Sequence, residues 1–143
     1  MIREASLTDI PGIIECLRSL STSPFETKEE KMSVVRAFKE RMECGNIFTY
    51  VYEDKGEILG TITILMERKL SHCGGLAGYI TDVAVRKNSQ KKGVGTELTD
   101  FGIEFIKSLG AYKRTLNCSK NLQKYYEKFG FEKSGYEMRM DVI

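Results

Sequence analysis

Residues 90–95, with the sequence Gln-Lys-Lys-Gly-Val-Gly, are the part of the chain best suited to chemistry. They follow an apolar, strand-like run at 79–85 and precede a helix-like run at 96–109. Glycines at such a turn let the backbone approach a ligand closely, because no Cβ intervenes. The free N–H groups and the dipole at the start of the helix favour an anion. The segment therefore predicts a cradle for phosphate or pyrophosphate, and it points to a nucleotide-containing cofactor.

Three glycine-rich patterns could account for such a cradle. The chain has no G-x-x-x-x-G-K-[ST] string, which excludes a Walker P-loop. A dinucleotide fingerprint needs G-x-G-x-x-G near the first strand, whereas the glycines here lie late in the chain and lack the third member. The third pattern, [RQ]-x-x-G-x-[GA], is matched by Gln90, Gly93 and Gly95, and it resembles the pyrophosphate loop of the GNAT acetyltransferase superfamily. A glycine-rich helix start that binds no ligand is the remaining alternative.

Length and charge narrow the class of protein. The 143 residues suit one domain, 1–143, with a full hydrophobic core. With 22 basic and 20 acidic side chains, the net charge of +2 is too balanced to indicate nucleic acid as a partner. No run approaches the roughly 20 apolar residues that a membrane-spanning helix needs. A local positive field is expected beside the glycine loop, from Arg86, Lys87, Lys91 and Lys92.

Cysteine and histidine usage argues against metal chemistry and for a reducing compartment. The four cysteines are scattered without a C-x-x-C pair, and His72 is the only histidine. We therefore expect neither a zinc site nor a disulfide framework. The first residues lack the apolar segment of a signal peptide. Together these features predict a cytoplasmic protein without a metal.

Hydrophobic periodicity predicts helices and strands along the whole chain. Apolar residues spaced by three and four positions indicate helices at 10–20, 28–43, 96–109 and 121–128. Runs rich in β-branched and aromatic residues indicate strands at 2–5, 47–53, 58–67, 77–86, 113–118 and 136–142, with a loop at 68–78. Because the central strands form hairpins, we expect a mixed α/β (α+β) fold with a mostly antiparallel sheet, not a doubly wound parallel one.

The order of these elements resembles the GNAT superfamily, and further strings narrow the resemblance to glucosamine 6-phosphate N-acetyltransferases. The strings are Glu-Arg-Lys-Leu-Ser-His at 67–72, Gly-Tyr-Ile-Thr-Asp-Val-Ala-Val at 78–85, Gly-Ala-Tyr-Lys at 110–113, Asn-Cys-Ser at 117–119 and Tyr-Tyr-Glu-Lys-Phe-Gly-Phe at 125–131. The similarity extends over nearly the whole chain. It implies a GNAT-type sheet with helices on both faces and a splayed pair of strands. It also implies acetyl transfer from acetyl-CoA to the amine of glucosamine 6-phosphate.

The resemblance implies which residues hold the cofactor. A splayed strand would bond the pantetheine arm through its backbone, and the glycine loop would hold the pyrophosphate through amide N–H groups. The residues concerned are Val83, Ala84, Val85, Gln90, Lys91, Lys92, Gly93, Val94, Gly95, Thr96, Asn121, Tyr126 and Lys128. For Lys91 and Lys92 we expect a modest electrostatic steering role.

The resemblance assigns the chemistry to Tyr126, Asn117 and Asp82. Tyr126 would face the cofactor sulfur and donate a proton to the leaving thiolate; an ordinary packed aromatic is the alternative. Asp82 would bond the sugar hydroxyls. Asn117 stands where the family usually has aspartate, and Thr81 where it usually has glutamate. The residue that takes the proton of the amine is therefore left open, because an amide is not a useful base.

The sugar phosphate would be bound by residues from separate parts of the sequence. Lys69, Ser71 and His72 form the candidate phosphate clamp, since lysine is a compact charge suited to phosphate. The full set of expected substrate contacts is Thr22, Lys69, Leu70, Ser71, His72, Thr81, Asp82, Asn117, Cys118 and Arg139. In the family the site is completed across a homodimer interface, so the resemblance implies a homodimer.

Two other functions remain open. Thr81, Asn117 and Asp141 depart from the family pattern and favour a GNAT enzyme that acts on another amine, such as a protein N-terminus, a lysine or a polyamine. A non-catalytic domain that senses acyl-CoA would keep the cradle without turnover. A nucleotide-hydrolysing function is excluded, because the chain lacks a Walker lysine.

Overall fold

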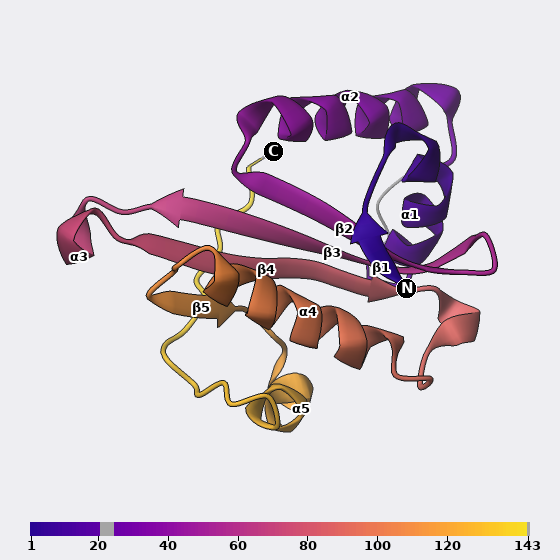
Figure 1. Cartoon of the computed structure of the whole chain (residues 1–143). Helices are drawn as coiled ribbons and strands as arrows, with labels where there is room; N and C mark the ends of the chain where they lie inside the picture. Colours follow the sequence, from indigo (N-terminus) through magenta and orange to yellow (C-terminus); the bar gives the residue numbers. More distant parts are fainter. Residues whose placement is uncertain (21–24, 143) are drawn as a thin grey trace.

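In the part of the chain that the structure describes, five strands form one sheet and follow their sequence order across it (Figure 1). The computed structural model describes residues 1–20 and 25–142. The strands are β1 (Ile2–Glu4), β2 (Ile47–Asp54), β3 (Glu57–Arg68), β4 (Leu76–Val85) and β5 (Lys113–Leu116). Neighbours from β1 to β4 pair antiparallel, and β5 lies parallel to β4. This arrangement confirms the expected mixed, mostly antiparallel fold.

Helices cover both faces of the sheet. The 3-10 turn η1 (Leu7–Asp9), α1 (Ile10–Leu17) and α2 (Lys28–Cys44) lie on one face, and α4 (Val94–Ser108) lies on the other (Figure 1). The shorter helical segments are α3 (Ser71–Gly74), η2 (Lys87–Ser89), η3 (Lys120–Leu122) and α5 (Gln123–Glu127). Within the described residues, every helix is too short or too polar to cross a bilayer.

Two of the short segments differ from the predictions. The expected helix at 121–128 is divided into η3 and α5. The expected loop at 68–78 contains α3, but His72 and Cys73 have φ angles of 51° and 56°, so this segment is a tight turn rather than a regular helix. Two consecutive non-glycine residues in the left-handed region make it a strained connection.

The sheet separates two hydrophobic cores. Side chains of α1 and α2 pack on one face against Val51, Ile58 and Ala84. On the other face, Ile62, Ile64 and Ile80 pack against Leu98 and Ile106 of α4, and all five are at most 2% exposed. Burial on both faces explains why β3 reads as a nearly continuous apolar run. Packing on both faces of the sheet fixes the positions of the ends of β4 and β5.

An ion-paired cluster ties the N-terminal strand to the start of the first helix. Asp9 is buried, and its carboxylate accepts hydrogen bonds from Arg3 at 2.8 and 2.9 Å and from the Ser6 backbone N–H at 2.8 Å. These bonds, the one from Arg3 above all, hold the pKa of Asp9 below its usual value. Arg3 also donates to Glu53 at 3.2 and 3.3 Å. The cluster therefore joins β1, η1 and β2.

The strand predicted at 136–142 is not formed within the single chain. Residues 132–142 run as an irregular segment without ladder pairing. The side chains of Tyr136, Met138, Met140 and Val142 are between 85% and 95% exposed. The alternation of apolar and polar residues suits a strand, but a strand also needs a neighbouring backbone. Within the described chain, no other strand lies alongside to supply one.

We predict that Asp9→Asn will lower the free energy of unfolding at pH 7 by about 1–3 kcal/mol, the usual cost of breaking a buried charge-assisted bond. The folded-state pKa of Asp9 is depressed, so its contribution is present above the unfolded value and is lost as pH falls through the folded value. Urea unfolding at several pH values should therefore show the two proteins converging in acid. Glu53→Gln is the control, with a smaller expected effect because its bonds are longer.

Candidate active site

Strand β4 is irregular at the position where the sequence places the chemistry. Thr81 pairs with Thr63 of β3 and Ala84 pairs with Thr61, so Asp82 and Val83 together stand opposite one residue of β3. Asp82 has a φ angle of 50°, in the left-handed region that non-glycine residues seldom adopt. This is a β-bulge, and bulges re-aim side chains and interrupt pairing.

Beyond the bulge, β4 has a neighbour on one side only. The parallel pairing with β5 covers only four residue pairs, from Ala77 with Lys113 to Ile80 with Leu116. β4 continues to Val85, whereas β5 ends at Leu116. In the described chain, the backbone of residues 81–85 that faces away from β3 therefore has no strand beside it, which is the splay expected from the resemblance. The Val85 carbonyl on this edge accepts a bond from the Gln90 side chain. An extended ligand with amide groups can bond this free edge.

The glycine loop presents backbone N–H groups at the same end of the sheet. Gly93 has a φ angle of 85° and caps the N-terminus of α4. The first bond of this helix runs from the Glu97 N–H to the Gly93 carbonyl at 3.0 Å, so the N–H groups of residues 94–96 precede the helical ladder. A side chain at Gly93 would be strained at this φ angle. The loop has the geometry of an anion seat.

Positive charge beside the loop comes mainly from lysines. Lys91 and Lys92 are exposed and form no ion pair with the described residues. Arg86, in contrast, donates to the Ile58 carbonyl at 3.0 Å and pairs with Glu57 at 3.5 Å. It is therefore engaged in holding β4 against β3. Gln90 is tied to the end of β4 by a bond from its amide to the Val85 carbonyl at 3.3 Å.

Tyr126 on α5 is half-buried in an aromatic cluster. Its ring contacts Tyr125 edge-on, with centroids 5.0 Å apart, and also lies near Phe129 and Phe131. Burial first, and then the neighbouring Tyr125 and Cys118, raise the pKa of Tyr126 above its ordinary value. The phenol therefore keeps its proton at neutral pH. It can act as a proton donor to a leaving group beside it.

Tyr125, also on α5, contacts the first turn of α4. Its hydroxyl lies 3.1 Å from the Thr96 hydroxyl in the first turn of α4. This bond links α5 to the anion seat across 29 residues of sequence. The local sequence pattern carries no signal for this contact, because the contact depends on how α5 folds back onto α4.

Asn117 and Cys118 follow β5 directly and lie where the two strands part. Asn117 donates a hydrogen bond from Nδ2 to the Tyr79 hydroxyl at 2.7 Å. Burial first, and then the carboxylates of Glu137 and Asp82, raise the pKa of Tyr79. Tyr79 was not among the expected site residues, because an aromatic residue in an apolar strand is most simply explained by packing. The structure thus brings Asn117, Tyr79 and Asp82 near one another, at the place along β4 where β5 ends.

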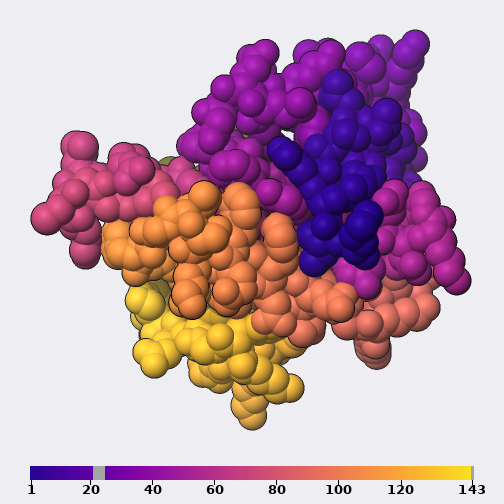
Figure 2. All heavy atoms as spheres, viewed as in Figure 1, coloured from indigo at the N-terminus to yellow at the C-terminus, as the bar shows by residue number. Residues whose placement is uncertain are grey.

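The candidate phosphate clamp lies at the opposite end of the β3–β4 hairpin. Figure 2 shows this tip, with α3, projecting from the body of the protein. His72 stacks on Tyr112 with ring centroids 4.1 Å apart, and Lys69 pairs with Glu67 at 3.4 Å. From Leu76 to Asp82 the strand spans roughly 20 Å, at about 3.3 Å per residue. Within one chain, the clamp and Asp82 are therefore separated.

The other predicted contacts are scattered over the surface. Leu70 is 99% exposed at the hairpin tip, beside Ser71. Asn121 and Lys128 are exposed at the two ends of the η3–α5 segment. Arg139 pairs with Asp141 at 2.6 Å on the C-terminal segment. Thr22 lies outside the described residues.

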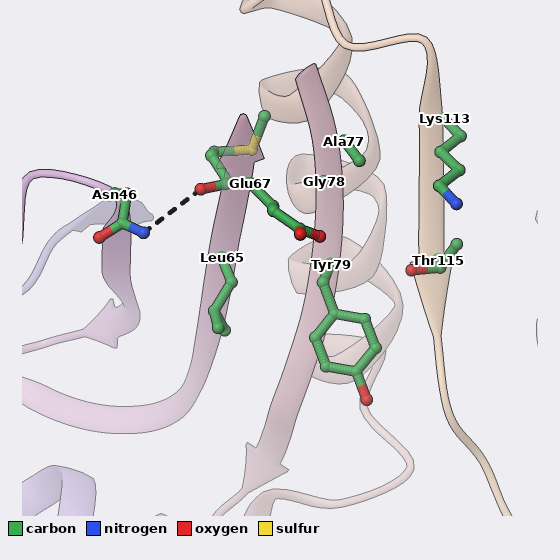
Figure 3. Close-up of a pocket in the computed structure, with 9 residues that line it drawn as sticks. Asn46, Leu65, Glu67, Ala77, Gly78, Tyr79, Lys113 and Thr115 are labelled. Carbon is green, nitrogen blue, oxygen red and sulfur yellow. Dashed lines mark hydrogen bonds between the residues drawn. The ribbon is translucent and has the colours of Figure 1, made fainter. Parts of the chain in front are cut away.

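A shallow hollow lies on the sheet face that α1 and α2 leave partly uncovered (Figure 3). Its volume is about 360 Å³. The residues that line it are Asn46, Leu65, Met66, Glu67, Ala77, Gly78, Tyr79, Lys113 and Thr115. The hollow extends along β4 between the hairpin tip and the place where the strands part.

Comparison with known proteins agrees with this arrangement. Residues 16–143 match the family model described as an acetyltransferase (GNAT) domain. The chain is 32% identical over 141 residues to glucosamine 6-phosphate N-acetyltransferase from Arabidopsis thaliana, which covers 96% of this chain and 93% of the plant protein.

Solved structures show the same fold. The crystal structure of glucosamine-6-phosphate N-acetyltransferase from Arabidopsis thaliana aligns with a TM-score of 0.89 at 31% identity, covering 100% of this chain and 98% of the other. A transcriptional regulator from Bacillus halodurans aligns with a TM-score of 0.91 at 26% identity, covering 99% of each chain. Fold similarity alone therefore does not decide the substrate. The matched family model and the free-edged strand beside an anion seat agree that the chain belongs to the GNAT acetyltransferase family.

Proposed function

We propose that this enzyme transfers the acetyl group of acetyl-CoA to the amine of D-glucosamine 6-phosphate. GNAT enzymes use acetyl-CoA, and the observation that carries the cofactor assignment is the unpaired edge of β4 beside the N-terminus of α4. The sugar assignment is supported by the plant relative, which matches almost from end to end. The pantetheine arm lies along residues 83–85, and the pyrophosphate sits on the N–H groups of the glycine loop.

The reaction is a direct transfer within a ternary complex. The neutral amine attacks the thioester carbonyl carbon, and a backbone N–H near Val83 stabilises the oxyanion that forms. Once the N–C bond has formed, the oxyanion collapses to restore the carbonyl, the C–S bond breaks, and the departing thiolate of coenzyme A takes the proton of Tyr126. The nitrogen releases its own proton to water, and Tyr126 recovers one from solvent. Cys118 is exposed and has no base beside it in the described chain, so no acetyl-enzyme is needed.

A second copy of the chain completes the sugar site. In one chain the phosphate clamp, Lys69 and His72, is far from Asp82, so a clamp supplied by a partner accounts for both groups. The C-terminal segment offers a contact surface, because its apolar side chains alternate and are exposed. The uncovered hollow on the sheet is a second surface that a partner can close. The protein is thus a homodimer with shared sites.

The first prediction concerns the phosphate. Because a charge-assisted hydrogen bond contributes about 1.5–3 kcal/mol, kcat/KM for glucosamine 6-phosphate should exceed that for glucosamine by roughly 10- to 100-fold. Release of thiol from acetyl-CoA provides the measurement. His72→Ala and Lys69→Ala should remove most of this difference while leaving KM for acetyl-CoA in place.

Equal rates with the two sugars would show that the clamp is assigned wrongly. A panel with a peptide N-terminus, a lysine peptide and a polyamine covers the other amines. Preference for one of these would replace the sugar assignment but keep the enzyme class. Binding of acetyl-CoA in calorimetry without turnover of any amine would leave only an acyl-CoA sensor.

The second prediction concerns the proton donor. Tyr126→Phe should lower kcat by about 10²-fold, the usual contribution of a general acid, with a smaller rise in KM for acetyl-CoA. Tyr125→Phe is the matched control. It removes the bond to Thr96 and should act mainly on KM for acetyl-CoA. An unchanged kcat in Tyr126→Phe rules out the donor role.

The third prediction concerns assembly. Light scattering should give the wild-type protein a mass of twice 16.3 kDa. Met138→Lys combined with Met140→Lys should give monomers, because each charge would be placed on the apolar side of the segment. Met42→Lys, at an exposed methionine on α2, is the control and should remain dimeric. A wild-type protein that is monomeric at micromolar concentration contradicts the dimer.

A further inference from the structure

The hydrogen bond between Asn117 and Tyr79 joins two strands at the point where they part. Tyr79 pairs with Thr115 on β5, and Asn117 follows two residues later. The Asn117 amide nitrogen donates to the Tyr79 hydroxyl at 2.7 Å, the shortest distance expected for such a bond. Figure 3 shows the Tyr79 ring projecting from β4, with its hydroxyl at the outer end of the side chain. The pair therefore stands beside the unpaired edge of β4.

The direction of this bond is set by its donor, the Asn117 amide nitrogen. A hydroxyl has one proton to donate and can also accept, so it could in principle bond either end of an amide. Asp82 and Glu137 carry carboxylates near Tyr79, and an ionised carboxylate only accepts hydrogen bonds. Burial first, and then their negative charge, raise the pKa of Tyr79 and so keep the phenol protonated. The oxygen lone pair of Tyr79 is then left to accept from the Asn117 amide.

The direction of the bond determines which end of Asn117 is free. With Nδ2 engaged by Tyr79, the carbonyl oxygen Oδ1 is turned away from the tyrosine. Among residues 1–20 and 25–142, no donor bonds this oxygen. Asn117 is exposed, so Oδ1 is accessible to a ligand. A carbonyl oxygen is an acceptor, and a substrate amine supplies N–H donors.

We propose that Tyr79 is a positioning residue that holds the Asn117 amide with its carbonyl oxygen toward the substrate amine. This inference rests on the proposed function, because it requires an amine to be acetylated at this place. Oδ1 accepts one N–H of the amine and so orients the nitrogen lone pair toward the thioester carbonyl. The amide takes no proton; it orients the nucleophile, and the proton leaves to water.

The pair explains how a neutral residue can serve at position 117. A carboxylate presents an acceptor oxygen whichever way it is rotated, whereas an amide presents an acceptor from one end and donors from the other. An unconstrained asparagine would place its NH₂ group against the amine in part of the population. Tyr79 removes that misorientation. The dependence on Tyr79 is therefore a property of asparagine and disappears with aspartate.

Two backgrounds test this dependence. Tyr79→Phe is introduced into the wild-type chain and into Asn117→Asp, and steady-state kinetics are measured with whichever amine of the panel turns over best. In the wild-type background, kcat/KM for the amine should fall by about tenfold, the effect of one lost hydrogen bond, with KM for acetyl-CoA unchanged. In the Asn117→Asp background, the same substitution should change kcat/KM by less than about threefold.

Equal losses in the two backgrounds would mean that Tyr79 only braces the strands, and the proposal would be wrong. The ¹H–¹⁵N spectrum provides a second measurement that does not depend on turnover. The Asn117 side-chain NH₂ pair, assigned by its absence in Asn117→Asp, should shift in Tyr79→Phe, and an unmoved pair would contradict the hydrogen bond. A wild-type enzyme inactive on every amine refutes the proposed function itself, and this inference with it.

Discussion

The early end of β5 is the constraint on which the rest of the site depends. A parallel pairing that stops after four residue pairs leaves β4 with free backbone groups that must find other partners. The bulge at Asp82 increases the divergence by interrupting the pairing on the other side. A slot opens between the strands as a result. The anion seat at α4 and the aromatic cluster at α5 both lie next to that slot, because each follows one of the two parting strands in sequence.

The two faces of the sheet differ in how completely helices cover them. The α4 face is sealed by large buried side chains, and this rigidity keeps the glycine loop in place relative to β4. The opposite face is covered by α1 and α2 over parts of β2 and β3 and over the end of β4, but it is hollow beside Tyr79 of β4 and Thr115 of β5. A C-terminal segment with an exposed apolar side belongs to the same chain. The proposed contact between two copies would remove both exposed surfaces from water.

Hydrogen-bond chemistry limits what the amide of Asn117 can do in the site. Where the resemblance led us to expect a carboxylate, this chain has the amide of Asn117. An amide can replace the acceptor function but not the negative charge or the basicity. In our proposal, Tyr79 accepts from the amide nitrogen and so fixes which end of the Asn117 amide faces the substrate. The carboxylates of Asp82 and Glu137 help to keep the Tyr79 phenol protonated. Local networks of this kind decide which details of a family mechanism a member can retain.

Much of the fold could be predicted from the sequence, because its signals are local. Periodicity located β2, β3, β4, α2 and α4 to within about two residues, and the glycine pattern at 90–95 located the start of α4. What the sequence left open depends on groups far apart along the chain. The pattern at 136–142 predicted a strand, but pairing needs a second backbone, which the single chain does not place there. The bonds of Asn117 with Tyr79 and of Thr96 with Tyr125 span 38 and 29 residues, and only the tertiary structure brings their partners together. The residue types thus determined which chemical groups are available. Long-range packing decided which of these groups meet and how each side chain is oriented.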